Sequence, residues 1–471
     1  MTNVIAKKGG EWLYLSILGL TAVIAVLVAP DYALWVFFSI IVASIIFFYP
    51  EISYYLAVLT ISVELLFIDF FVRTSMHDCI FFAHLLLIIA FISWVFARMA
   101  GTRDKAPTYG LEYLIGFFMI FCAISFLWSE DRIHGSVELF ILCASLSALI
   151  LSIAFLKNKQ TINIVLWIFI FMGIVNSVIA LYSLHSQYEG TVLYQYQDFS
   201  LKMTFNPNRL AFKGHGLLPP PATAFFLNLT LFLAFGKLLS STNLKTRILL
   251  FFIIMTIFAG HMTTLSKSAL LGLLAGFIFL IINEDTLKKW FFTSAFILIA
   301  VIVFSFVISH IDTLYKTINY GVFRAVSPSE GTTSLSTRIT FWTIGTDLLI
   351  KSDSLGTGIG GYKQNNVFWP HAHSIYFSTL FELGFIGLWA WLFILGEVLR
   401  RLLNSLKKCT DKYWRSILLG YIGGYISMLI TGLFDFEYEY SIIWLYIGIG
   451  IALNVIIEKQ TAKKNPQKLS F

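Results

Sequence analysis

The sequence predicts an all-α protein: a polytopic transmembrane helical bundle of about fourteen spans with a large, partly helical loop on its outer face. Three observations predict this fold class. Hydrophobic residues make up 58% of the 471 residues and charged residues only 13%, about half the charged share of a soluble domain. Apolar runs of about 20 residues, the length that crosses a bilayer, recur along the chain. Lys and Arg gather in short clusters between these runs.

The predicted spans form two sets, separated by a long polar segment. The first set covers residues 12–29, 33–49, 53–72, 79–98, 111–128, 136–156 and 162–183, and the second covers 217–235, 247–262, 268–283, 290–309, 374–398, 414–433 and 440–457. The two short runs near 247 and 268 leave the count open by one or two. No clear small-residue cleavage site follows the first run, so we interpret it as an uncleaved span.

Basic residues predict the orientation, because cytoplasmic loops of membrane proteins are enriched in Lys and Arg. With a cytoplasmic N-terminus and alternating spans, most of the 33 basic residues fall in the inner loops and the C-terminal tail. We therefore expect both termini in the cytoplasm. The same clustering accounts for the net charge of +7, so this charge does not indicate a nucleic-acid partner.

Two predicted outer segments, residues 184–216 and 310–373, are longer than simple connectors. Loops of this length are usually functional or disordered, and these contain Tyr, Phe, Trp, His and Arg rather than a disorder-prone composition. We expect residues 1–309 to form spans 1–11 with a loop near 184–216. Residues 310–373 form the large loop that carries the active site, and residues 374–471 form the last three spans and a basic tail.

Residues 334–351, SLSTRITFWTIGTDLLIK, have apolar side chains near helical spacing and predict a short amphipathic helix on the membrane surface. Arg338 and Trp342 are four residues apart and share one face. Arg338 could anchor this helix to lipid headgroups or bind an anionic substrate. The following LGTGIGG matches GxGxxG without a strand–turn–helix context. We expect its glycines to allow a tight turn and close backbone approach to a ligand.

His373 lies where the outer loop meets a long apolar helix that Ser374 opens, after Pro370 has ended the preceding segment. The partial positive charge of a helix N-terminus disfavours protonation of an imidazole and favours a nearby anion such as phosphate. A neutral histidine beside a bound phosphate is well placed to act as a general base. The alternative is a histidine at headgroup depth without a chemical role.

A metal site is not expected, although His371 and His373 form an H-x-H pair and Glu382 is a possible third ligand. Glu382 lies about 13 Å further along a helix, whereas ligands of one zinc ion lie at about 2 Å from it. The four cysteines also suggest neither a zinc site nor a disulfide framework. Glu382 remains notable, because a charge within an apolar span is costly and usually functional or paired.

Further basic residues lie on the predicted outer side: Lys267 begins a span and Arg209 lies in the other long loop. If both loops fold over one site, Arg209, Lys267, Arg324 and Arg338 could surround an anion such as pyrophosphate. Each of these side chains could instead lie at the membrane interface and extend its charge into water without binding an anion. We favour this alternative for Arg324.

The C-terminal half resembles the O-antigen ligase and polymerase superfamily. His373-Ser374, followed after nine residues by Gly384-Phe-Ile-Gly387, fits the family pattern H-[NSQ]-x9-G-x-x-G. Upstream, residues 336–342 and 356–358 resemble the family's S-x-R-x-x-x-W and G-x-G stretch.

Two earlier segments resemble the superfamily as well. Residues 205–208, FNPN, resemble its asparagine-containing loop motif, and residues 264–268, TLSKS, resemble a segment that usually carries Arg. The chain departs from the pattern at Lys267, which keeps the charge but lacks the bidentate geometry of a guanidinium.

The resemblance implies a metal-independent, inverting, membrane-embedded glycosyltransferase without a cofactor. It would act at the periplasmic face of the cell inner membrane in lipopolysaccharide biosynthesis. The donor would be a polysaccharide on undecaprenyl pyrophosphate and the acceptor a sugar hydroxyl of lipid A–core. On this hypothesis His373 is the base for the acceptor hydroxyl, and Arg338, Lys267 and Arg209 hold the pyrophosphate. The expected supporting residues are Trp342, Ser374, Glu382, Gly384 and Gly387.

Three alternatives remain open. A polymerase that joins lipid-linked repeat units shares the histidine motif, and a third member class glycosylates protein. A polysaccharide transporter or flippase is a different class, for which Glu64 and Asp69 in a predicted span could form an ion route. Against it, polar groups concentrate outside the spans, whereas a transporter has its site near the midplane.

Overall fold

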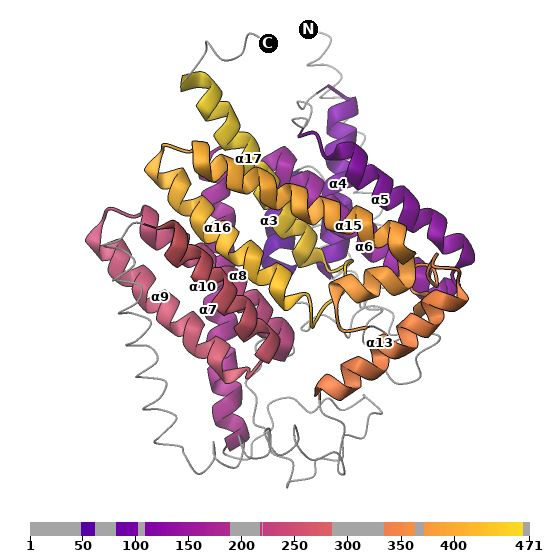
Figure 1. Cartoon of the computed structure of the whole chain (residues 1–471). Helices are drawn as coiled ribbons and strands as arrows, with labels where there is room; N and C mark the ends of the chain where they lie inside the picture. The colour runs from indigo at the N-terminus through magenta and orange to yellow at the C-terminus, as the bar shows by residue number, and fades with distance from the viewer. Residues whose placement is uncertain are drawn as a thin grey trace, which may run out of the picture.

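The computed structural model describes residues 49–61, 82–101, 109–188, 217–218, 220–284, 334–362 and 372–464. All regular secondary structure in these residues is helical, which confirms the predicted all-α class (Figure 1). The first group of helices is α3 (Pro50–Ile61), α4 (Phe82–Met99), α5 (Glu112–Ser125) with a 3-10 turn (Phe126–Trp128), α6 (Arg132–Phe155) and α7 (Lys159–Tyr188). The second is α8 (Pro220–Ser240), α9 (Leu244–Thr263), α10 (Lys267–Asn283), α13 (Ser334–Lys351), α15 (Ile375–Lys408), α16 (Lys412–Thr431) and α17 (Ser441–Lys464).

Six helices of this described part are long and apolar enough to cross a membrane: Arg132–Phe155, Lys159–Leu184, Pro220–Ser240, Leu244–Thr263, Ile375–Lys408 and Ser441–Thr461. Shorter apolar helices cover Ala83–Met99, Glu112–Trp128 and Lys267–Asn283. Each predicted span that falls in the described residues coincides with a helix. The predicted spans at 12–29 and 290–309, and nearly all of 33–49, lie outside these residues. The number of about fourteen spans therefore stays a prediction.

Helices α8, α10 and α16 pack closely against one another through small residues. A side chain on Gly420 of α16 would collide with the backbone of Phe232 and Gly236 in α8, and one on Gly272 of α10 would collide with Thr431 in α16. Such close approach is how helices associate in lipid, where apolar burial alone gives little driving force. As a result α8 is 94% buried along its most apolar stretch.

Helix α15 is interrupted at Gly384, whose backbone adopts φ 63° and ψ −166°. The interruption leaves carbonyl groups in the preceding turn without helical partners, and an adjacent loop supplies the donors. Thr357 N–H donates to the Phe381 carbonyl at 2.9 Å and Gly358 N–H donates to the Glu382 carbonyl at 2.9 Å. The glycine-rich segment after α13 therefore approaches the backbone of α15. The predicted close approach of these glycines to a ligand stays a prediction.

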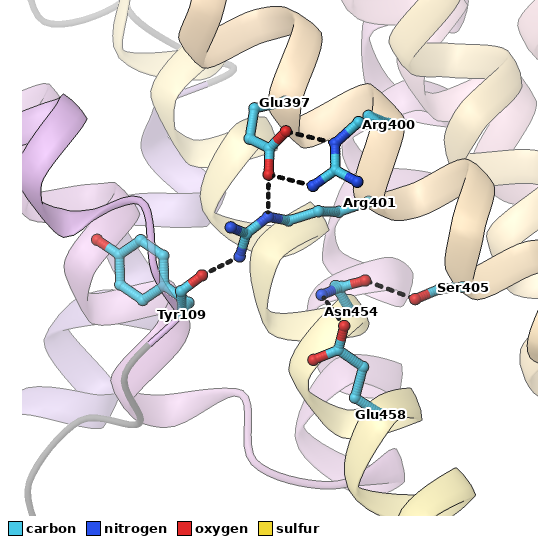
Figure 2. Close-up of polar contacts among 7 residues, drawn as sticks. All are labelled: Tyr109, Glu397, Arg400, Arg401, Ser405, Asn454 and Glu458. Atoms are coloured by element: carbon cyan, nitrogen blue, oxygen red, sulfur yellow. Dashed lines mark hydrogen bonds and ion pairs between the residues drawn. The ribbon is translucent and has the colours of Figure 1, made fainter. Parts of the chain in front are cut away.

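The connections predicted to be cytoplasmic come together at one end of the bundle. Arg401 near the end of α15 pairs with Glu397 at 2.7 Å and donates to the Tyr109 carbonyl in the segment before α5 (Figure 2). Ser405 of α15 donates to Asn454 of α17 at 2.5 Å. We call this the basic end, defined by Lys159, Lys237, Arg400, Arg401, Lys412 and Arg415. In Figure 1 the last turns of α17 lie at the top and α13 lies at the bottom right.

Candidate active site

Three separate segments meet at Asp435, which follows α16. Its Oδ1 lies 3.6 Å from Nδ1 of His373, at the start of α15. Its Oδ2 lies 3.6 Å from a terminal nitrogen of Arg338 in α13 and accepts a hydrogen bond of 3.0 Å from Ser268 in α10. The Asp435 carboxylate thus contacts both the histidine and the arginine that we predicted from the sequence to be catalytic.

The position of His373 is set by the junction of α15 with α16. Ser374 caps α15 by accepting a hydrogen bond from Phe377 N–H, which is the role expected of a serine at a helix start. Ile375 N–H donates to the carbonyl of Gly432 at 2.9 Å and so ties the start of α15 to the end of α16. His373 itself has φ 52°. A positive φ is uncommon for a residue with a side chain and often marks functional sites.

Aromatic contacts hold α13 against this junction. The Trp342 indole N–H donates to the Ala372 carbonyl at 3.0 Å, and its ring stacks on Phe377 with centroids 4.6 Å apart. Phe341 is buried and stacks on the His373 imidazole with centroids 5.8 Å apart. The imidazole therefore has an aromatic ring on one side and a carboxylate facing its Nδ1. The predicted supporting residue Trp342 lies where it can fix both α13 and the histidine segment.

The three charged or titratable groups are partly open to solvent. The side chains of His373, Arg338 and Asp435 are 23%, 20% and 10% exposed. Both distances to Asp435 are 3.6 Å, which is longer than a hydrogen bond, so these contacts are electrostatic. A carboxylate at Nδ1 orients the ring, and it stabilises the imidazolium that forms when the other nitrogen accepts a proton.

Of the remaining residues predicted to bind an anion, the structure describes Lys267 only. Lys267 opens α10 directly before Ser268, so its backbone adjoins the site, and its side chain is exposed. No ion pair of Lys267 is present in the residues that the structure describes. Arg209, Arg324 and His371 lie outside those residues, so the predicted ring of four cations stays a prediction.

Glu382 does not join this cluster. It lies two residues before the α15 kink and is 5% exposed, and its Oε2 accepts a hydrogen bond of 2.9 Å from the Tyr438 hydroxyl. The polar partner expected for an intramembrane carboxyl is therefore supplied by the segment between α16 and α17. Gly384 forms the kink itself, and Gly387 is buried in the next turn of α15. These residues shape the helix that carries His373.

A second group of carboxyls lies behind the site, in the same segment. Burial raises the pKa of Glu439 to about 7, and burial likewise raises the pKa of Glu437 well above its usual range. No group of three or more His, Cys, Asp or Glu in the described part of the chain is arranged to hold a metal ion. The titratable and charged side chains at the candidate site itself are those of Asp435, His373 and Arg338.

Sequence reasoning missed Asp435, Ser268 and Phe341. Asp435 had a usable signal, because it is an acidic residue that directly follows the predicted span 414–433 on the side where His373 is expected. Ser268 and Phe341 had none, since a serine at a helix start and a phenylalanine on an apolar face are ordinary in any membrane protein.

Comparison with known proteins finds a matching family model. A family model described as O-antigen ligase matches residues 226–392, from α8 to the middle of α15, and so includes Lys267, Arg338, His373 and the kink at Gly384. Asp435 lies beyond the matched region. No curated protein matches the chain. The family match agrees with the resemblance found in the sequence motifs and supports assignment of this chain to the O-antigen ligase superfamily.

Proposed function

We propose that this protein transfers a polysaccharide from undecaprenyl pyrophosphate to a sugar hydroxyl of lipid A–core, at the periplasmic face of the cell inner membrane. Membership of the superfamily supports glycosyl transfer of the O-antigen ligase and polymerase type. The single observation that carries the more specific chemistry is the pair of contacts at Asp435, because it holds a potential base and a fixed cation beside each other.

The acceptor hydroxyl is deprotonated by His373. Its Nδ1 faces Asp435, so the other ring nitrogen takes the proton as the oxygen attacks the anomeric carbon of the donor. The new carbon–oxygen bond forms while the bond to the pyrophosphate breaks, and this single displacement inverts the anomeric centre. The Asp435 carboxylate offsets the positive charge that the imidazole gains.

The leaving pyrophosphate is stabilised by fixed cations. Arg338 faces the carboxylate that also faces His373, so its guanidinium lies beside the proposed base. Its guanidinium matches phosphate oxygens in pairs. Lys267 and Arg209 complete the anion site in this proposal. In this proposal the cations stabilise the developing charge, and no metal ion or cofactor takes part.

The test is the glycan profile of cells that carry His373→Ala in place of the wild-type protein. We expect polymer to accumulate on the lipid carrier in the outer leaflet, while the lipid A-linked fraction loses its polysaccharide. Lys351→Ala, an exposed position at the end of α13, is the control and should keep the wild-type profile. Normal ligation by His373→Ala at normal protein levels would remove this residue from the mechanism.

The same experiment separates the other functions. Single repeats on the carrier in the outer leaflet would indicate a lost polymerase, and substrate retained on the inner leaflet would indicate a lost flippase. The intramembrane acids that a flippase route would need, Glu64 and Asp69, lie outside the described residues.

A further inference from the structure

Two lysines converge on one tyrosine ring at the basic end. Nζ of Lys159 lies 3.7 Å from the ring centroid of Tyr413, and Nζ of Lys237 lies 5.8 Å from it. Asn163 Oδ1 accepts hydrogen bonds from Lys237 at 2.5 Å and from the Tyr413 hydroxyl at 3.1 Å. Helices α7, α8 and α16 thus hold two ammonium groups close together, although like charges repel.

Neither lysine forms an ion pair with another residue that the structure describes. Among the residues that the structure describes, no carboxylate oxygen lies within the ion-pair limit of 4.0 Å from either lysine. Lys237 is only 8% exposed. A buried charge is costly unless it is paired or hydrogen-bonded, and a neutral amide and a ring face compensate it in part. The pair of lysines therefore favours an anionic ligand.

An apolar groove begins at the same residues. Its volume is about 440 Å³. Asn163, which bonds Lys237, lines it, and so does Trp167, whose ring centroid lies 5.3 Å from Nζ of Lys237. Gln160, next to Lys159 at the start of α7, also lines it. The groove then continues along α7 and α3 between Ile164, Phe171 and Leu59. The two cations lie beside the end of the groove that Asn163 and Trp167 form, and most of the remaining lining is aliphatic and aromatic.

We propose that this groove binds an anionic phospholipid. The phosphate lies between Lys159 and Lys237, and an acyl chain lies along the wall formed by α7 and α3. A soluble anion would use the lysines but not the apolar wall, and a zwitterionic lipid would bring a positive group to a positive site. The basic end is also the end predicted to face the cytoplasm, where basic pockets between membrane helices bind acidic headgroups. This site is separate from the one at Asp435.

The proposed binding of the lipid phosphate by Lys159 and Lys237 is tested on the purified full-length protein in neutral detergent. Dioleoylphosphatidylglycerol and dioleoylphosphatidylcholine are titrated separately, and bound lipid is counted by native mass spectrometry. We expect tight binding of phosphatidylglycerol alone, and about fivefold weaker binding in Lys159→Gln and in Lys237→Gln. Lys159 is exposed, so its variant tests the charge without disturbing buried packing. Lys245→Gln, an exposed lysine elsewhere at this end, should bind like the wild type.

The proposed binding of the acyl chain in the groove is tested with Ile164→Trp, because Ile164 lines the groove and is 40% exposed. We expect this ring to fill the groove and to weaken phosphatidylglycerol binding while the protein stays folded. Inorganic phosphate alone should not compete at millimolar concentration. The proposal is overturned if Lys159→Gln binds phosphatidylglycerol like the wild type, if phosphatidylcholine binds equally well, or if phosphate displaces the lipid. Tighter binding of a polyprenyl phosphate would assign the groove to an isoprenoid carrier instead and would equally overturn it.

Discussion

Nδ1 of His373 faces Oδ1 of Asp435 across 3.6 Å, although 62 positions separate them in the sequence. Asp435 also faces Arg338 and accepts a hydrogen bond from Ser268. The carboxylate is therefore the common contact of three segments, and in our proposal it orients the base rather than touching the substrate.

Replacing this carboxylate by an amide should slow the transfer strongly. We expect Asp435→Asn to lower turnover by on the order of 10²–10⁴-fold, because the amide neither stabilises the imidazolium nor fixes the ring tautomer. Substrate KM should change little, and the pH profile of turnover should shift, which a purely structural role would not produce. Asp411→Asn is the matched control: Asp411 caps α16 at the basic end, and asparagine caps as well as aspartate. Equal losses in both variants would contradict the positioning role.

Turnover should depend on both the planar shape and the charge of the Arg338 guanidinium. We expect Arg338→Ala to lower turnover by about 10²–10³-fold, since one fixed donor to developing negative charge contributes about that much. Arg338→Lys should recover only part of the loss, because an ammonium cannot bind phosphate oxygens in pairs. Single-turnover transfer measured with saturating lipid-linked donor distinguishes the three proteins. Full activity of Arg338→Ala would show that the pyrophosphate is held elsewhere.

The kink in α15 should depend on glycine at residue 384. With φ 63°, a side chain there is strained, and it would collide with the backbone of Ser354 and Leu355. We expect Gly384→Ala to lower the stability by more than about 1 kcal/mol and to abolish transfer by displacing the start of α15. Gly396→Ala, in the same helix with no atom near its added methyl group, should be neutral. Thermal unfolding of both purified variants provides the comparison.

Glu439 should make the stability depend on pH. Burial raises its pKa in the folded protein to about 7 from an ordinary value of 4.5. A raised folded-state pKa means that the folded protein binds this proton more tightly than the unfolded chain does. The contribution to stability is therefore complete below about pH 4.5 and is lost as the pH rises through 7. As the pH rises from 5 to 8, the midpoint temperature of thermal unfolding should decrease in the wild type. We expect a smaller decrease in Glu439→Gln. Parallel curves would show that Glu439 is not the group responsible.

Much of the architecture and part of the site could be predicted from sequence. Helix positions follow from apolar length, which is a local property, so every predicted span within the described residues has its helix. His373 and Arg338 stood out because each lies in a short motif beside a recognisable helix start or face. The family match then agreed with those motifs over residues 226–392.

The rest was decided by tertiary structure. Nothing local marks Asp435 as the partner of a histidine in another segment, because that contact arises only when the end of α16 packs on the start of α15. The glycines after α13 predicted a close backbone approach, but only packing shows that the approach is to the kinked turn of α15. Hydropathy and spacing therefore determine which segments become helices and which residue types lie at their ends. Which ends meet depends on how the helices pack, and that is a property of the whole bundle.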